Sequence, residues 1–121
     1  MNGLDNYRDA IGSQNVLTGD DTARWQSDWT GQYKASPLAV LRPSSTEEVQ
    51  ACLQIASEHG HAVIPAGGLT GLNGALKTEG GIILSLDRMN RVLDIRPDAR
   101  IAIVEAGVIL GNLHDAVEAH D

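Results

Sequence analysis

Residues 38–65 decide the fold, and they read LAVLRPSSTEEVQACLQIASEHGHAVIP. The stretch opens with a short apolar run, 38–41, that is closed by Arg42 and Pro43, a pattern typical of a buried strand. It ends with a second apolar run, 62–65. Each run has the length of a strand, and the residues between them are numerous enough for one helix.

The middle of this stretch carries a helix signal. Ser45 and Glu48 have the spacing of a capping box, and Gly60 supplies a left-handed stop. The stripe that faces the core is expected to contain Val49, Cys52, Leu53 and Ala56. The spacing therefore predicts a helix over 46–59 between two adjacent, parallel strands that are joined by a right-handed crossover.

The C-terminal half continues with short apolar runs. A third strand is expected over 82–86 after a glycine pair, and 92–95 and 101–105 have the pattern of a hairpin. A last helix is indicated by Leu110, Leu113, Ala116 and Val117. The expected fold class is α+β, with an N-terminal βαβ unit of parallel strands followed by the first strands of a second, antiparallel subdomain.

The N-terminal side is less regular. Leu4, Tyr7 and Ile11 have helical spacing, and a loop is expected after them over 12–19. Residues 22–36 are polar and are expected to be irregular; their aromatic cluster, interpreted as packing, consists of Trp25, Trp29 and Tyr33. We therefore divide the chain into an N-terminal arm, 1–36, and the N-terminal part of a larger domain, 37–121, without a substrate domain.

Charge and cysteine content exclude several classes of function. The net charge is −7, whereas nucleic acids and anionic membranes attract a basic surface. Five basic residues between 77 and 100 leave two interpretations open, a local phosphate site or a solvated charged face. Cys52 is the only cysteine, which excludes an internal disulfide and a cysteine-ligated zinc site. Because no secretory signal and no membrane-spanning run is evident, the expected location is cytoplasmic.

A glycine-rich segment, PAGGLTGLNG at 65–74, follows the second apolar run. Glycines at the carboxyl end of a parallel strand let backbone N–H groups converge on phosphate oxygens, and those at 68 and 71 are expected to need positive φ. A turn-rich loop without a ligand is the alternative. The Rossmann fingerprint does not fit, because no Gly-x-Gly occurs, and a Walker loop does not fit, because Leu76 replaces its second glycine.

This loop resembles the FAD pyrophosphate loop of the vanillyl-alcohol oxidase and p-cresol methylhydroxylase (PCMH) family of flavoproteins. Three further segments, 40–49, 86–93 and 104–108, resemble landmarks of that family in the same order and at similar spacing. Residues 28–33, DWTGQY, are similar to the branch that oxidises D-2-hydroxy acids, which includes D-lactate, glycolate and D-2-hydroxyglutarate dehydrogenases. The resemblance runs from about Leu17 onward and implies an incomplete PCMH-type FAD-binding fold.

The resemblance also implies roles for individual residues. The FAD diphosphate would be wrapped, mostly through main-chain N–H groups, by Pro65, Ala66, Gly67, Gly68, Leu69, Thr70, Gly71 and Leu72. Leu69 stands where some relatives carry a histidine bonded to the flavin, which implies that FAD is held non-covalently. Many relatives have a basic or amide side chain at one of the positions 65 and 66, so one diphosphate contact would be missing. The substrate-binding arginine and the histidine cluster of the hydroxy-acid branch would lie beyond Asp121, so no catalytic residue is assigned.

Three functional hypotheses remain open. In the first, the chain is the FAD-binding portion of an oxidoreductase. The full-length enzyme would oxidise a small D-2-hydroxy acid and pass electrons to a separate acceptor, whereas this chain alone would be inactive. In the second, it is a non-catalytic nucleotide-binding module or subunit that acts with another chain; in the third, an inert fragment. Truncation would also favour self-association through side chains that lose partners, namely Ile82, Leu84, Ile101, Ile103 and Leu113.

The remaining polar residues carry weaker signals. His59 and His61 have no third ligand close in sequence, so no metal site is predicted. Glu105 is expected either to face the flavin or to cap a turn. Arg42 is interpreted as a solvated strand end.

Overall fold

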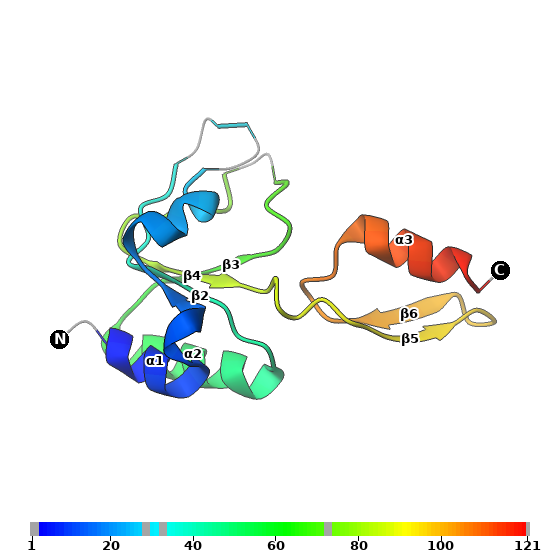
Figure 1. Ribbon diagram of the computed structural model, residues 1–121, viewed down its shortest axis with the longest axis horizontal. Coiled ribbons are helices and arrows are strands. Elements are labelled where there is room, and N and C mark those ends of the chain that lie inside the picture. Colours follow the sequence, from blue (N-terminus) through cyan, green and yellow to red (C-terminus); the bar gives the residue numbers. More distant parts are fainter. Residues whose placement is uncertain (1–2, 28–29, 32–33, 72–73, 121) are drawn as a thin grey trace.

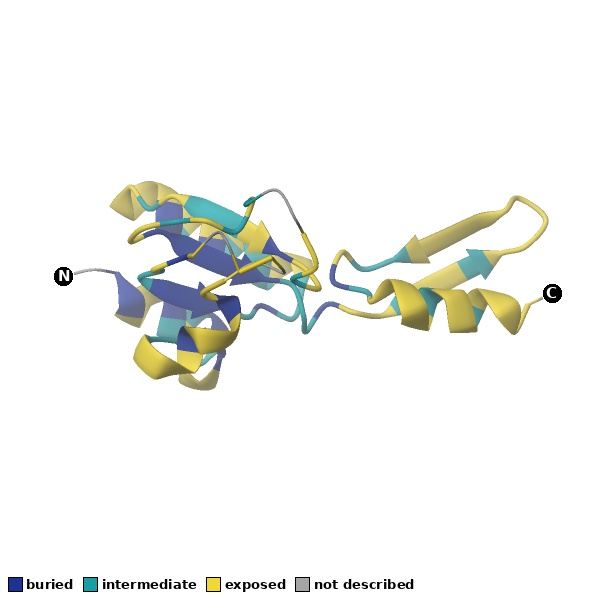
Figure 2. Cartoon of the chain, turned by 90° about the horizontal axis from the view of Figure 1, so that it is seen from above, coloured by how far each residue is buried: buried dark blue, intermediate teal, exposed yellow. Residues whose placement is uncertain are grey.

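The computed structural model describes residues 3–27, 30–31, 34–71 and 74–120. Figure 1 shows two parts, an α/β body built on a sheet and a smaller unit built from a hairpin and a helix. The segments 86–91 and 105–109 join the two parts. Buried residues gather in the α/β body, whereas most of the smaller unit is exposed (Figure 2).

The sheet of the α/β body has four strands in the order β1-β2-β4-β3. β4 is parallel to both of its neighbours, and β1 is antiparallel to β2. The strands are β1 (Val16–Leu17), β2 (Ala39–Leu41), β3 (Val63–Ala66) and β4 (Ile82–Ser85). The three strands expected from the apolar runs are therefore confirmed, together with the parallel direction of β2 and β3.

The prediction that β2 and β3 are adjacent is wrong. β4 lies between them, and its Ile82 pairs with Ala39 on one side and with Val63 on the other. All of β4 is buried, whereas Val63 and Ile64 of β3 are only half-buried. A strand of consecutive apolar residues removes the most apolar surface from water where both of its faces are covered. β4 therefore lies at the centre of the sheet and β3 at its edge.

The helix between β2 and β3 is confirmed as α2 (Thr46–His59). Ser45 Oγ accepts a hydrogen bond from Glu48 N at 3.2 Å, and Gly60 ends the helix at φ 70°. The Glu48 carboxylate accepts from the backbone N–H of Ser44 at 2.7 Å, one residue before the partner that a capping box would use. Both ends of the helix are thus set by local sequence.

Two helices cover one face of the sheet. They are α2 and α1 (Leu4–Ile11), which confirms the predicted N-terminal helix. The core on this face contains Leu4, Tyr7, Ile11, Val16, Ala39, Leu41, Cys52, Ala56, Ile82 and Leu84. Leu53 was expected in the buried stripe, but its side chain is 47% exposed. Burial raises the pKa of the Cys52 thiol to about 11, so this thiol is a core group rather than a reactive one.

N-terminal residues cover the opposite face as well. The expected loop over 12–19 instead contains a short 3₁₀ turn, η1 (Ser13–Asn15), and β1, and η2 (Gly19–Trp25) follows as a longer 3₁₀ helix. Trp25 of η2 is 4% exposed and forms a second core with Ala35, Val40, Ala66 and Ile83. The expectation of an irregular segment from residue 22 is wrong up to residue 25. Trp29 and Tyr33 lie outside the described residues.

The smaller unit is the predicted hairpin followed by a helix. β5 (Val92–Arg96) and β6 (Ile101–Val104) are antiparallel, and α3 (Leu110–Glu118) follows them. Large apolar side chains exposed in this unit or at its start are Leu93, Ile101, Ile103, Ile109, Leu110 and Val117. The expected exposure of Ile101 and Ile103 is therefore confirmed, whereas that of Ile82 and Leu84 is wrong because the α/β body buries both. In the described part of the chain, no helix has the length and apolarity needed to cross a bilayer.

Gly107 fixes the connection between the two parts. Its N–H donates to Met89 O at 2.8 Å, which ties the segment after β6 to the segment after β4. A Cβ at this position would overlap the carbonyl oxygen of Leu86. Only glycine allows this close approach of two backbones.

Candidate functional site

The predicted loop lines a pocket at the carboxyl end of β3. The pocket has a volume of about 210 Å³ and is lined by Pro65, Ala66, Gly67, Gly68, Leu69, Thr70, Gly71, Ala75 and Leu76. Seven of the eight predicted site residues thus share one concave surface, and the eighth, Leu72, lies outside the described residues. Among the described lining residues none carries a charged side chain, so the binding groups that they offer are backbone amides and one hydroxyl.

Two glycines of the loop keep its backbone open. A Cβ at Gly67 would meet no atom within 4 Å, and a Cβ at Gly68 would meet only Ile109 Cδ1, at 3.6 Å. The fold itself therefore does not require glycine at these positions, in contrast to Gly107. Space beside an accessible backbone is what the close approach of a phosphate group needs.

Leu69, rather than Gly68, has the left-handed conformation in this loop. Its φ is 63°, whereas the expected positive φ at Gly68 is not observed. A left-handed backbone costs a residue with a Cβ about 1 kcal/mol. The side chain of Leu69 packs against the core around Trp25, as does that of Leu76, and this packing offsets the cost.

A polar network lies beside the loop, at the carboxyl end of β4. Ser85 is the register partner of Ala66, and Leu86 N donates to Ala66 O at 2.9 Å. Trp25 Nε1 donates to Ser85 Oγ at 3.2 Å, and Ser85 Oγ donates to Asp87 Oδ1 at 3.0 Å. η2 is therefore linked through β4 to Ala66, the second residue of the loop.

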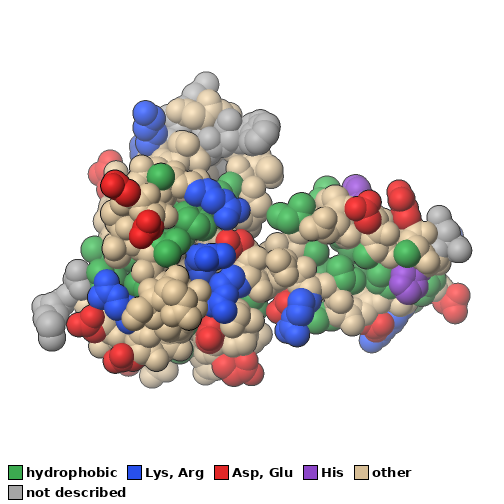
Figure 3. Space-filling model, in the orientation of Figure 1, with side chains coloured by type: hydrophobic (Ala, Val, Ile, Leu, Met, Phe, Trp, Pro, Cys, Tyr) green, Lys and Arg blue, Asp and Glu red, His purple; other side chains and the backbone are tan. Residues whose placement is uncertain are grey.

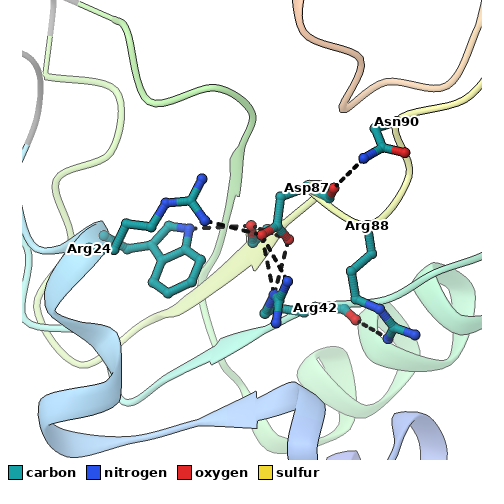
Figure 4. A network of polar contacts seen from close by, with 7 residues as sticks. Arg24, Arg42, Asp87, Arg88 and Asn90 are labelled. Carbon is teal, nitrogen blue, oxygen red and sulfur yellow. Dashed lines mark hydrogen bonds and ion pairs between the residues drawn. The ribbon is translucent and has the colours of Figure 1, made fainter.

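Asp87 is the centre of this network (Figure 4). Its carboxylate accepts from Arg42 Nε at 3.2 Å and pairs with Arg24 Nη1 at 3.3 Å, while Arg88 Nη1 donates to the carbonyl of Arg42 at 2.7 Å. Partial burial acts to raise the pKa of Asp87, but the hydrogen bonds from Arg42 and Ser85 and the charges of both arginines outweigh it, so the pKa lies below its ordinary value. The interpretation of Arg42 as a solvated strand end is wrong.

The structure also shows the surroundings of the polar residues whose sequence signals are weaker. Glu105 pairs with Arg91 Nε at 2.7 Å and accepts from Arg91 N at 3.0 Å, so its carboxylate joins the two strand ends at the open end of the hairpin. His61 Nδ1 lies 2.7 Å from Tyr7 Oη, and its ring stacks on that of His59 with 5.6 Å between centroids. Within the described ranges, no three His, Cys, Asp or Glu side chains converge as metal ligands would.

Sequence reasoning missed the Asp87 network. Its signal was present, since Arg42 directly follows β2 and Asp87 lies just beyond β4. The carboxyl ends of parallel strands share one edge of a sheet, so the two side chains could have been expected to meet once β2 and β4 were known to be neighbours. The incorrect strand order concealed this pair.

Comparisons with known proteins agree with this geometry. A family model described as an FAD binding domain matches residues 37–121. The chain is 41% identical over 97 residues to the D-2-hydroxyglutarate dehydrogenase of Xanthomonas citri pv. viticola, which covers 79% of this chain and 21% of that protein. It is 45% identical over 87 residues to the D-lactate dehydrogenase of Archaeoglobus fulgidus, which covers 71% of this chain and 19% of that protein. The chain thus corresponds to only a minor part of the length of each of these relatives.

Comparison with solved structures also finds related oxidases of this fold. The fold matches 4-ethylphenol oxidase from Gulosibacter chungangensis with a TM-score of 0.84 and 31% identity, over 98% of this chain and 24% of that one. It matches p-cresol methylhydroxylase with a TM-score of 0.82 and 26% identity, over the same shares of the two chains. The expected α+β fold class is therefore confirmed. With the family match over 37–121, these likenesses show that the chain belongs to the FAD binding domain family of oxidoreductases of the p-cresol methylhydroxylase type.

Proposed function

We propose that this chain holds the diphosphate of FAD in the loop over 65–72 and that no covalent bond joins it to the flavin. The observation that carries the proposal is the pocket at the end of β3, where the described residues of the loop share one surface. Its open glycine backbone and neutral lining suit an anion that is bound by N–H groups. The site also lies at the carboxyl ends of parallel strands, where open α/β sheets bind their ligands.

The non-covalent part of the proposal rests on Leu69. Its side chain has no nucleophilic atom, and it packs against the core around Trp25 rather than presenting a reactive group to the pocket. Acid precipitation of the chain loaded with FAD should therefore release all of the flavin into the supernatant. Yellow colour that stays with the washed precipitate would contradict this point alone.

We further propose that, in a complete protein, the flavin bound here oxidises a D-2-hydroxy acid. The support is that two relatives, at 41% and 45% identity, are named D-2-hydroxyglutarate dehydrogenase and D-lactate dehydrogenase. A bound flavin supplies hydride acceptance, while the protein supplies binding and orientation. The described residues of this chain contribute the phosphate-binding backbone and its support, and none of them is assigned a role in contact with substrate.

The binding proposal is tested with a pair of valine variants. Gly68→Val places a branched side chain in the open space beside the loop, where the fold leaves room for it, so binding should be lost while stability changes little. Gly111→Val is the matched control, because Gly111 lies in α3 with open space around it. Titration of FAD fluorescence gives the affinity, and circular dichroism shows whether each variant is folded.

We expect the wild-type chain and Gly111→Val to bind FAD, and Gly68→Val to bind at least tenfold more weakly, a loss of at least about 1.4 kcal/mol. Leu69→Ala should have a smaller effect, because the proposed contacts come from the main chain. Equal affinity of folded Gly68→Val and wild type would refute the assignment of the loop. Absence of FAD binding by the wild-type chain would refute the proposal for this chain as a whole.

A further inference from the structure

The phosphate-binding loop has no charge of its own. Every described residue that lines its pocket is neutral, whereas the diphosphate of FAD carries two negative charges. Backbone amides bind phosphate oxygens well, but they leave the net charge of the ligand unbalanced. The surroundings of the pocket are therefore the place to look for a cation.

Basic side chains gather close to this edge of the sheet. Figure 3 shows Lys and Arg side chains together on the visible face of the α/β body, beside the smaller unit. The network around Asp87 brings together three guanidinium groups, of Arg24, Arg42 and Arg88, and one carboxylate. This local excess of positive charge stands out in a chain whose net charge is −7.

The three arginines differ in their partners and in how far their side chains are exposed. Arg42 contacts the Asp87 carboxylate through both Nε and Nη2, at 3.2 and 3.1 Å. Arg88 donates to the carbonyl of Arg42, at the end of β2, and β2 lies on the far side of β4 from the loop. Arg24 makes one contact with Asp87, at 3.3 Å, and its side chain is 58% exposed. Arg24 is therefore the most exposed of the three, since the side chains of Arg42 and Arg88 are half-buried.

Arg24 is also the arginine whose neighbour in the chain, Trp25, packs against residues of the loop. The neighbouring Trp25 packs in the same core as Ala66, Leu69 and Leu76, all of which line the pocket. Ser85, which bonds to both Trp25 and Asp87, is the register partner of Ala66, and paired strands lie ~4.8 Å apart. The guanidinium of Arg24 is thus held beside the strand from which the loop leaves.

The position of the guanidinium is fixed from two directions. It lies over the indole ring of Trp25, 5.1 Å from the ring centroid, and it pairs with Asp87. Both contacts are compatible with a third partner, because a guanidinium has five N–H donors. The acidic residues of η2, Asp20 and Asp21, lie in its first turn, at the opposite end from Arg24.

We propose that Arg24 supplies the positive charge for the diphosphate of FAD, with Trp25 and Asp87 holding its guanidinium beside the loop. This proposal rests on the function proposed above and adds a positioning network to it. It also gives the segment 19–25 a role in cofactor recognition, although the predicted loop begins only at residue 65.

The test compares Arg24→Gln with Arg24→Lys and with Arg8→Gln in the 121-residue chain. Arg8 is a matched control, because it is an arginine paired with one aspartate, at 2.9 Å, on α1, which covers the opposite face of the sheet. FAD and riboflavin are both titrated by fluorescence, since riboflavin lacks the phosphates. Each titration is repeated at about 0.05 M and about 0.5 M salt, because added salt screens exposed charges.

At low salt we expect Arg24→Gln to bind FAD about fivefold more weakly than wild type, which is the upper range for an exposed charge interaction. Arg24→Lys and Arg8→Gln should remain within about twofold of wild type, riboflavin affinity should be unchanged, and the difference should largely disappear at high salt. Equal FAD affinity of Arg24→Gln and Arg8→Gln would overturn the proposal. So would a loss that is the same for riboflavin, or the same at both salt concentrations, because a charge that acts on the diphosphate cannot produce either result.

This result is separable from failure of the proposed function. If the wild-type chain binds FAD and Arg24→Gln binds it equally well, the loop assignment stands and the role of Arg24 is refuted. If the wild-type chain binds no FAD, the proposed function fails, and the role of Arg24 fails with it. Thermal unfolding of each variant confirms that the compared proteins are folded.

Discussion

Replacement of Trp25 tests whether the first 36 residues are part of the core. Trp25 is 4% exposed and packs against Val40, Ala66 and Ile83 of the sheet. Truncation of a buried tryptophan to alanine costs about 3–5 kcal/mol through lost burial and the cavity that remains. Because a chain of this length has a free energy of unfolding of roughly 6–18 kcal/mol, Trp25→Ala should remove a large part of its stability.

A second variant separates packing from hydrogen bonding. Trp25→Phe keeps an aromatic ring in the core but loses the N–H that donates to Ser85 Oγ, so it should cost about 1–2 kcal/mol. Leu53→Ala is the control, since Leu53 is 47% exposed on α2 and should cost less than about 1 kcal/mol. The free energies of unfolding come from urea denaturation followed by circular dichroism.

The order of the three decreases in the free energy of unfolding is the decisive result. We expect Trp25→Ala to be the largest, Trp25→Phe to be intermediate and Leu53→Ala to be the smallest. A loss for Trp25→Ala no larger than that for Leu53→Ala would show that η2 does not contribute to the core, and the proposed support of the loop by this segment would fail with it.

Three further outcomes are expected. Gly107→Ala should destabilise the protein by about 1–3 kcal/mol in thermal unfolding, because its Cβ overlaps a backbone carbonyl; an unchanged midpoint would contradict this contact. Asp87→Asn should reduce the free energy of unfolding most above about pH 4, and the difference from wild type should shrink as the pH falls below that. The reason is that a carboxylate with a lowered pKa stabilises the fold only while it is ionised. A difference independent of pH would contradict the ion pairs. The double variant Ile101→Ser, Ile103→Ser should reduce self-association in sedimentation equilibrium, because both side chains are exposed apolar groups of the hairpin. An unchanged mass distribution would exclude the exposed side chains of β6 as the contact.

Local signals were sufficient for most elements. The bounds of α2 follow from Ser45 and Gly60, which act on their own backbone. The hairpin and the strands follow from short apolar runs between turn residues. These features depend on neighbours within a few residues, so a single sequence contains them.

Strand order could not be predicted in the same way. The simplest expectation for a strand–helix–strand unit is that β2 and β3 are adjacent. No local signal indicates that a later strand will lie between them. The signal was indirect, since β4 is apolar at consecutive positions and Val63 and Ile64 are flanked by polar or small residues. Deciding between centre and edge requires the burial of all three strands to be compared.

The candidate site was predictable where its chemistry is in the backbone. The glycine-rich segment was singled out from its composition and position, the family resemblance assigned the individual residues, and those from Pro65 to Gly71 do line one pocket. Arg24 and Asp87 could not be found this way, because they are 63 positions apart in the chain and meet only through the fold. The left-handed conformation of Leu69 was also unexpected, since its support comes from the core around Trp25.

The central position of β4 has a consequence for the order of folding. When the chain emerges from the ribosome, β2, α2 and β3 are all made before β4, yet β2 and β3 bond to β4 and not to each other. The first two parallel strands thus have no partner strand between them until residue 85 has been synthesised, and closing the sheet requires contacts across long sequence separations, which slow folding. During that interval the apolar residues of both strands are open to other chains, so the rate at which β4 inserts should determine how much of the newly made protein reaches its native state.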